Sequence, residues 1–181
     1  VLGNTQVNVC AVKNAAPATD YSSVTISGTD YEGVLIKGNV FGGGKGVADN
    51  FFCNKAMIGE DGKGKTDSNY AEGNTNVIIG NGTIGGTVYG GGEIGRVEAN
   101  TNVTIGLEEG AGEPVIEGNV FGAGRGAHTH GYAALVRGNT TVTVQGEAKV
   151  RKSVYGGGEI ASVGKYNIAD AAYHEEHPEV L

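Results

Sequence analysis

The sequence predicts an all-β fold, a parallel β-helix (β-solenoid) built from repeated two-strand units. A motif of valine, an aromatic residue and glycines occurs four times, at residues 40–44, 88–92, 120–124 and 154–158. Between these copies, Val and Ile alternate with polar residues at the period of two that is typical of a half-buried strand. One such unit cannot bury its apolar face alone, whereas stacked units form a continuous core. Periodicity does not reveal strand direction, so the alternative is a β-sandwich or β-prism of repeated hairpins.

The composition restricts the class of partner. Glycine contributes 34 of 181 residues without the strict period of three that collagen requires. The formal net charge is −7, with acidic and basic residues mixed along the chain, so we expect no nucleic-acid partner. No apolar run is long enough for a membrane-spanning helix, so we expect no membrane span. Because the chain starts at Val1 without an initiator Met or a signal peptide, we interpret it as processed or as a piece of a longer protein.

The repeat domain is expected to cover residues 1–166, with loop insertions at 47–72 and 127–136. The inward side chains are expected to be the alternating pairs Val7/Val9, Val24/Ile26, Val77/Ile79, Val103/Ile105 and Val142/Val144. The first apolar residue of each later pair is separated from the valine of the next motif by 16, 11, 17 and 12 residues (24 to 40, 77 to 88, 103 to 120 and 142 to 154). Long and short units therefore alternate, and the repeat is a pair of units. Residues 167–181 are predicted to form a short helical cap or linker, with Asn167 as the N-cap and Pro178 as the stop.

Charged residues follow the glycines at the same position of each unit and alternate in sign: Lys45, Glu93, Arg125 and Glu159. Stacked strands lie about 4.8 Å apart, which is close enough for neighbouring side chains to pair. Each exposed pair contributes only about 0–1 kcal/mol. We therefore expect this charge ladder to control register more than it stabilises the fold.

An aromatic residue precedes the glycines in every copy: Phe41, Tyr89, Phe121 and Tyr155. If the preceding valines point into the core, these aromatic side chains form an exposed stripe. Such a stripe can pack on an inserted loop or a neighbouring subunit, or stack on a sugar ring. If the orientation is reversed, the same residues belong to the core.

Two other residue types are candidates for covalent or metal chemistry. Cys10 and Cys53 are predicted to form a disulfide, with two buried thiols as the alternative. The histidines occur as two close pairs, and each pair supplies only two imidazoles, so we predict no metal and no cofactor: the weak candidates are His128, His130, His174 and His177.

The search for catalytic motifs is negative. The triple glycines lack the Gly-Lys-Ser/Thr of a phosphate-binding loop. Glu93 and Glu159 are repeat equivalents, which suggests a structural role rather than an acid–base pair. We expect no enzymatic activity. A polysaccharide-degrading enzyme is a weaker alternative, as is an ice-binding solenoid based on the incomplete ladder of Thr25, Thr104 and Thr143.

The repeated Val-(Phe/Tyr)-Gly-(Gly/Ala)-Gly motif, with Asn-Thr-x-Val-x-(Ile/Val) between its copies, resembles the glycine-rich repeats of bacterial (Bacteroidetes-like) cell-surface proteins of the β-solenoid adhesin or fibre type. The resemblance covers roughly residues 73–164 well and brings no catalytic residue. It implies an extracellular or cell-surface structural protein: a stalk, an adhesin segment or a self-associating fibre subunit. The expected partners are further copies of the chain or other cell-surface proteins. Glycans are the alternative partners, in a carbohydrate-binding module that uses the aromatic stripe.

Overall fold

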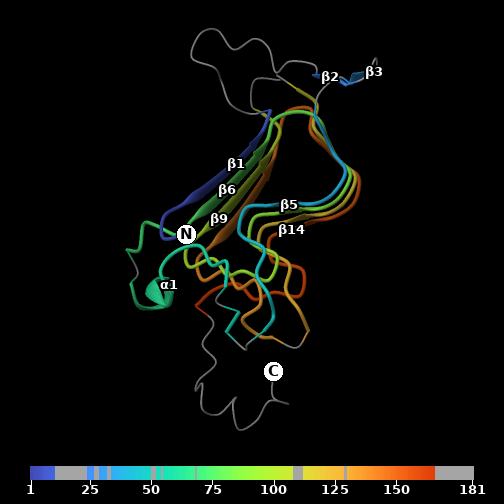
Figure 1. The fold of residues 1–181 in the computed structure, drawn as a ribbon. Coiled ribbons are helices and arrows are strands. Elements are labelled where there is room, and N and C mark those ends of the chain that lie inside the picture. The colour runs from blue at the N-terminus through green and yellow to red at the C-terminus, as the bar shows by residue number, and fades with distance from the viewer. Residues whose placement is uncertain are drawn as a thin grey trace.

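The computed structural model describes residues 1–10, 24–26, 29–31, 34–49, 52–53, 55–67, 69–107, 112–128 and 130–165. In these ranges the chain winds through four stacked coils (Figure 1). The long sheet has the order β1-β6-β9-β12, and all its neighbours pair in parallel. Its strands are β1 (Thr5–Val9), β6 (Thr75–Ile79), β9 (Thr101–Ile105) and β12 (Thr140–Val144).

Two further parallel sheets of two-residue strands complete each coil. One contains β4 (Leu35–Ile36), β7 (Thr83–Ile84), β10 (Val115–Ile116) and β13 (Lys149–Val150). The other contains β5 (Val40–Phe41), β8 (Val88–Tyr89), β11 (Val120–Phe121) and β14 (Val154–Tyr155). The parallel pairing confirms the predicted β-helix and excludes the sandwich and prism of hairpins. Each coil has three strands, whereas the sequence predicted two. The prediction missed the sheet of β4, β7, β10 and β13, because two residues are too few for alternation to reveal a strand.

One predicted strand lies outside the stack. β2 (Val24–Ile26) pairs antiparallel with β3 (Thr29–Tyr31) in a separate two-stranded sheet. The first place in the long sheet belongs to β1, where Val7 pairs with Val77 and Val9 with Ile79. The expectation that Val24 and Ile26 form a strand of the repeated units was therefore wrong, as was the spacing measured from residue 24 to 40.

The Asn-Thr pair before the alternating valines explains why β1 takes that place. The threonine hydroxyl crosses the coil and donates to the carbonyl of the first glycine after the aromatic residue. The four bonds measure 2.7, 2.5, 2.5 and 2.5 Å, for Thr5–Gly42, Thr75–Gly90, Thr101–Gly122 and Thr140–Gly156. Residues 22–23, which precede β2, are Ser-Ser, so β2 lacks the Asn-Thr pair.

The asparagine of the same pair connects consecutive coils. The Asn4 side-chain oxygen accepts from the backbone N–H of Asn74 at 2.9 Å. Asn74 accepts from Asn100 at 3.0 Å, and Asn100 from Asn139 at 2.8 Å. Each side-chain oxygen therefore satisfies a backbone donor at the start of the next long strand.

The apolar core fills the interior between the three sheets. Its buried members include Val77, Ile79, Val88, Val103 and Val120. In the first coil Val9 and Val40 are buried as well, whereas their equivalents in the last coil, Val144 and Val154, are exposed.

A fourth stacked position lies beyond the charge ladder. Ile58, Val97, Val136 and Val163 form successive parallel bridges, and the first three belong to a second apolar cluster with Ala123. The insertions 47–72 and 127–136 are therefore not loops throughout, because each places one apolar residue in this column. The insertion at 47–72 also contains α1 (Lys63–Thr66), the one helix among the described residues. Residues 167–181, predicted as a helical cap or linker, lie outside the described residues.

Candidate functional site

The aromatic residues Phe41, Tyr89, Phe121 and Tyr155 form a column of stacked rings. Their centroids are separated by 4.6, 5.3 and 4.7 Å, and the ring planes are inclined by 4°, 5° and 10°. Stacking covers the ring faces, so Tyr89 is 3% and Phe121 7% exposed, while Tyr155 at the open end is 46% exposed. The expected exposed stripe was therefore wrong for the central rings, although their valine neighbours do point into the core.

The Tyr89 hydroxyl leaves the column on its charged side. It donates to a carboxylate oxygen of Glu159, which lies two coils further along the stack, in the last coil. Burial of the phenol raises the pKa of Tyr89 well above its usual range, and the hydrogen bond to Glu159 raises it further. The bond joins the aromatic column to the charge ladder.

The charge ladder consists of four side chains in adjacent coils. Lys45, Glu93, Arg125 and Glu159 form successive parallel bridges through their backbones. The Lys45 ammonium lies 3.5 Å from Glu93, and the Arg125 guanidinium lies 3.8 Å from Glu93 and 3.7 Å from Glu159. Every carboxylate therefore faces a cation in the neighbouring coil. These pairs are partly exposed, so each contributes little to stability at physiological salt.

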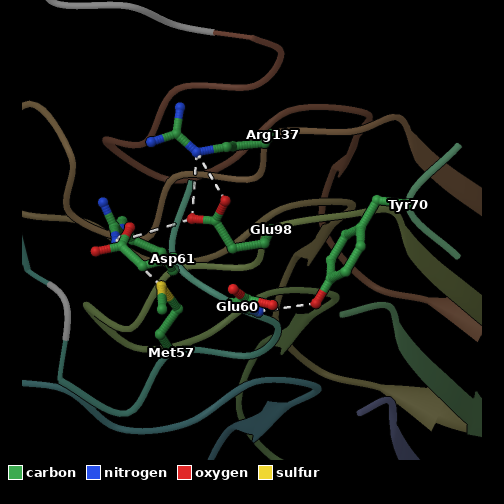
Figure 2. Close-up of polar contacts among 7 residues, drawn as sticks. Met57, Glu60, Asp61, Tyr70, Glu98 and Arg137 are labelled. Carbon is green, nitrogen blue, oxygen red and sulfur yellow. Dashed lines mark hydrogen bonds and ion pairs between the residues drawn. The ribbon is translucent and has the colours of Figure 1, made fainter. Parts of the chain in front are cut away.

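A second group of charges is buried. Glu98 is fully buried, and its carboxylate lies 3.0 Å from Nε of Arg137 and 3.8 Å from Nη2 of Arg96 (Figure 2). Arg96 is also buried and donates to the side chains of Asp61 at 2.5 Å and Met57 at 3.0 Å. A buried charge requires such partners, because its desolvation costs several kcal/mol.

Tyr132 completes this polar cluster, which we define as the buried Arg96, Glu98, Arg137 and Tyr132 together with the exposed Asp61. Both guanidinium groups lie over its ring, at 5.6 Å for Arg96 and 5.5 Å for Arg137. Cation–π contacts of desolvated guanidinium groups contribute about 2 kcal/mol or more. The insertion at 127–136 thus supplies the ring that holds two cations from the coils.

Sequence reasoning missed this cluster. A signal was present, because Glu98 follows Val97 and Arg137 follows Val136 at equivalent positions of adjacent coils. Val97 and Val163 each lie 9 residues after the valine of their glycine motif, whereas Ile58 and Val136 lie 18 and 16 residues after theirs, so the insertions hide the alignment of this column in the sequence.

A cavity of about 300 Å³ adjoins the cluster. Its lining includes Asp67, Tyr70, Glu98, Asn100, Arg137 and Asn139. Glu98 is held by Arg137, and Asn100 and Asn139 belong to the asparagine ladder. The Tyr70 hydroxyl accepts from the backbone N–H of Glu60 at 2.8 Å and points toward it in Figure 2. Most polar residues of this lining thus already take part in contacts that stabilise the coils and the insertion.

The two cysteines are not joined in a disulfide, so the predicted pairing was wrong. Cys10 follows β1 and packs against the main apolar core. Cys53 is fully buried near the charges of Arg96 and Asp49, and burial raises the pKa of its thiol. The two residues therefore belong to different parts of the first coil.

The structure describes two of the four histidine candidates. His128 is exposed and His130 half-buried in the insertion at 127–136. Among the described residues, no group of three His, Cys, Asp or Glu side chains is placed to hold a metal ion. His174 and His177 lie outside the described residues.

Comparison of the chain with protein-family models, with curated proteins and with solved structures gave no match. In the part of the chain that the structure describes, no helix has the length and apolar character needed to cross a membrane.

Proposed function

We propose that this chain is an extracellular structural module, a stalk, an adhesin segment or a fibre subunit, that acts without catalysis. The observation that carries the proposal is the continuity of its ladders through all four coils. Asparagine, aromatic and charged side chains make contacts between neighbouring coils, and the threonine side chain makes the same contact inside each coil. The side chains that recur most regularly in this sequence thus close each coil and hold neighbouring coils together.

The shape of the stack supports a mechanical role. Parallel strands place the backbone hydrogen bonds between coils along the axis, as in the bonds from Gly90 to Phe121 and from Thr101 to Asn139, both 2.9 Å. Repeat proteins of this kind behave as quasi-one-dimensional rods whose stability comes from contacts between neighbours. Such a rod is suited to holding a constant distance at a surface.

The glycan-binding alternative receives less support. Sugar rings bind to the open faces of aromatic side chains. Here the faces of Tyr89 and Phe121 are covered by their neighbours in the column, which leaves Tyr155 as the most exposed ring. A glycan array whose signal disappears in Tyr155→Ala would favour this alternative.

Two measurements test the structural function. Intact cells that produce the protein should bind an antibody against the coils and lose that signal after protease treatment, whereas labelling only after permeabilisation would contradict the extracellular role.

Single-molecule stretching between residues 1 and 165 should give a resolved unfolding force. This force should fall in Thr101→Val, which removes the hydrogen bond from Thr101 to the Gly122 carbonyl. The matched variant Thr104→Val, in the same strand, should leave it unchanged. A featureless extension curve would contradict the mechanical role.

A further inference from the structure

The last coil presents an open end. Val144, Val154, Tyr155 and Ile160 are between 44% and 48% exposed, although the equivalents of the first three in the interior coils are buried. The strands of this coil also have one unpaired edge in each parallel sheet. Edges of this kind accept a further strand readily.

The glycines of the last coil fit a following coil. A Cβ on Gly42, Gly90 or Gly122 would lie 2.1–2.3 Å from the carbonyl oxygen of the equivalent glycine in the next coil. Glycine is therefore required at these positions by the coil that follows. Gly156 and Gly157 continue the motif, yet a Cβ on either would meet nothing within 4 Å. Nothing among the described residues requires glycine there.

The first coil shows the complementary pattern. A Cβ on Gly86 or Gly118 would point back to the preceding coil, at 2.6 Å from the Gly38 oxygen and 2.3 Å from the Gly86 oxygen. Gly38 itself has nothing within 4 Å. Val9 and Val40 are already buried, whereas the exposed or half-buried residues of this coil include Gly3, Leu35, Gly38, Phe41 and Lys45.

The two ends also match in charge and in ring order. The charge ladder starts with the cation Lys45 and ends with the anion Glu159, and the aromatic column starts with Phe41 and ends with Tyr155. A second copy placed on the last coil would continue both alternations without a break. The asparagine ladder would continue as well, because Asn139 would accept from the backbone N–H of Asn4 as Asn74 accepts from Asn100.

We propose that two copies of this chain associate head to tail, with the last coil of one stacked on the first coil of the next. Tyr155 then stacks on Phe41, Glu159 pairs with Lys45, and Gly156 lies against the Gly42 carbonyl. The proposal rests on the proposed structural function and specifies how a fibre subunit would self-associate. Because the two contacting faces differ, the association is heterologous and continues beyond two copies.

Gly156→Ala and Gly38→Ala test this interface from its two sides. Each variant adds one methyl group where the isolated chain has open space, so each should fold with unchanged circular dichroism. In the assembly, each methyl group would meet a backbone carbonyl of the other copy. Sedimentation velocity over a concentration series should show elongated assemblies for the unaltered chain and monomers for each variant. Asn102→Ala, an exposed substitution in the middle of the long sheet, should assemble like the unaltered chain.

Mixing the two variants gives the decisive measurement. Gly38→Ala retains the open last coil and Gly156→Ala retains the open first coil, so an equimolar mixture should form a 1:1 dimer and no larger species. An unaltered chain that stays monomeric at all concentrations would overturn the proposal. Assemblies that persist in both variants, or that depend on only one of the two glycines, would overturn it too, because another surface or another occupant would then be involved. Surface labelling of cells is independent of this result, so the two proposals can fail separately.

Discussion

Gly90→Ala is predicted to destabilise the protein strongly, while the same change at the repeat-equivalent Gly156 is predicted to be neutral or slightly stabilising. Both glycines follow the Val-Tyr pair of the same heptapeptide motif, and neither has a positive φ. The substitutions are therefore chemically identical and differ only in the coil that contains them.

The contacts around Gly90 set the size of the expected loss of stability. Its added Cβ would lie 2.1 Å from the Gly122 oxygen and 2.9 Å from Cγ2 of Val103, whereas 3.4–4 Å is an ordinary contact. The coils must separate locally by about 1 Å, which strains the 2.9 Å bond from Gly90 to Phe121 and the 2.5 Å bond from Thr101 to Gly122. We expect a loss of about 3 kcal/mol, the upper part of the range for overpacking. For a domain of this size that lowers Tm by roughly 6–12 °C.

At Gly156 the unfolded state decides the outcome. Alanine reduces the conformational freedom of the unfolded chain, which stabilises a protein by about 0.4–1 kcal/mol where the native backbone tolerates it. Urea unfolding followed by circular dichroism, at a concentration low enough to keep the chain monomeric, measures both variants. Equal destabilisation at the two positions would refute the reasoning, because contact with the next coil would then not be the reason for glycine at Gly90.

Three further predictions concern the threonine hydrogen bond, the buried charges and the Tyr89 hydroxyl. Thr101→Val should cost about 1–2 kcal/mol in urea unfolding, because the buried Gly122 carbonyl loses its donor, while Thr104→Val should change the free energy of unfolding by a few tenths. Arg137→Gln should cost about 3 kcal/mol because it removes the nearest cation from the buried Glu98, and adding Glu98→Gln should restore part of that loss; strictly additive losses would contradict the pairing. The raised pKa of Tyr89 implies a stabilising contribution that is complete below the ordinary tyrosine value, about pH 10, and decreases as the pH rises above it. The Tm of Tyr89→Phe should therefore fall less steeply than that of the unaltered chain between about pH 10 and pH 12.

The repeated motif was sufficient to predict the architecture because the same residues meet at each level of the stack. Val88, Val120 and Val154 occupy one column, and Lys45 to Glu159 occupy another, so similarity in sequence corresponds to position in space. The failure at Val24 and Ile26 has a physical cause, since alternation alone identifies a strand but not its partner. The threonine and asparagine contacts that select β1 instead are made with residues of other strands and other coils.

The sequence by itself determined the solenoid class, the number of glycine motifs and the order of charges and rings along the stack. These properties depend on local periodicity and on the need of each unit to bury one apolar face. Only the tertiary structure decided that the rings of Tyr89 and Phe121 are covered, that Cys10 and Cys53 remain apart, and that Glu98 is buried beside Arg137. Those outcomes depend on what lies against a residue in the neighbouring coil or in an insertion. Within one chain, an added Cβ therefore meets the next coil at Gly90 and open space at Gly156, although the two motifs are identical.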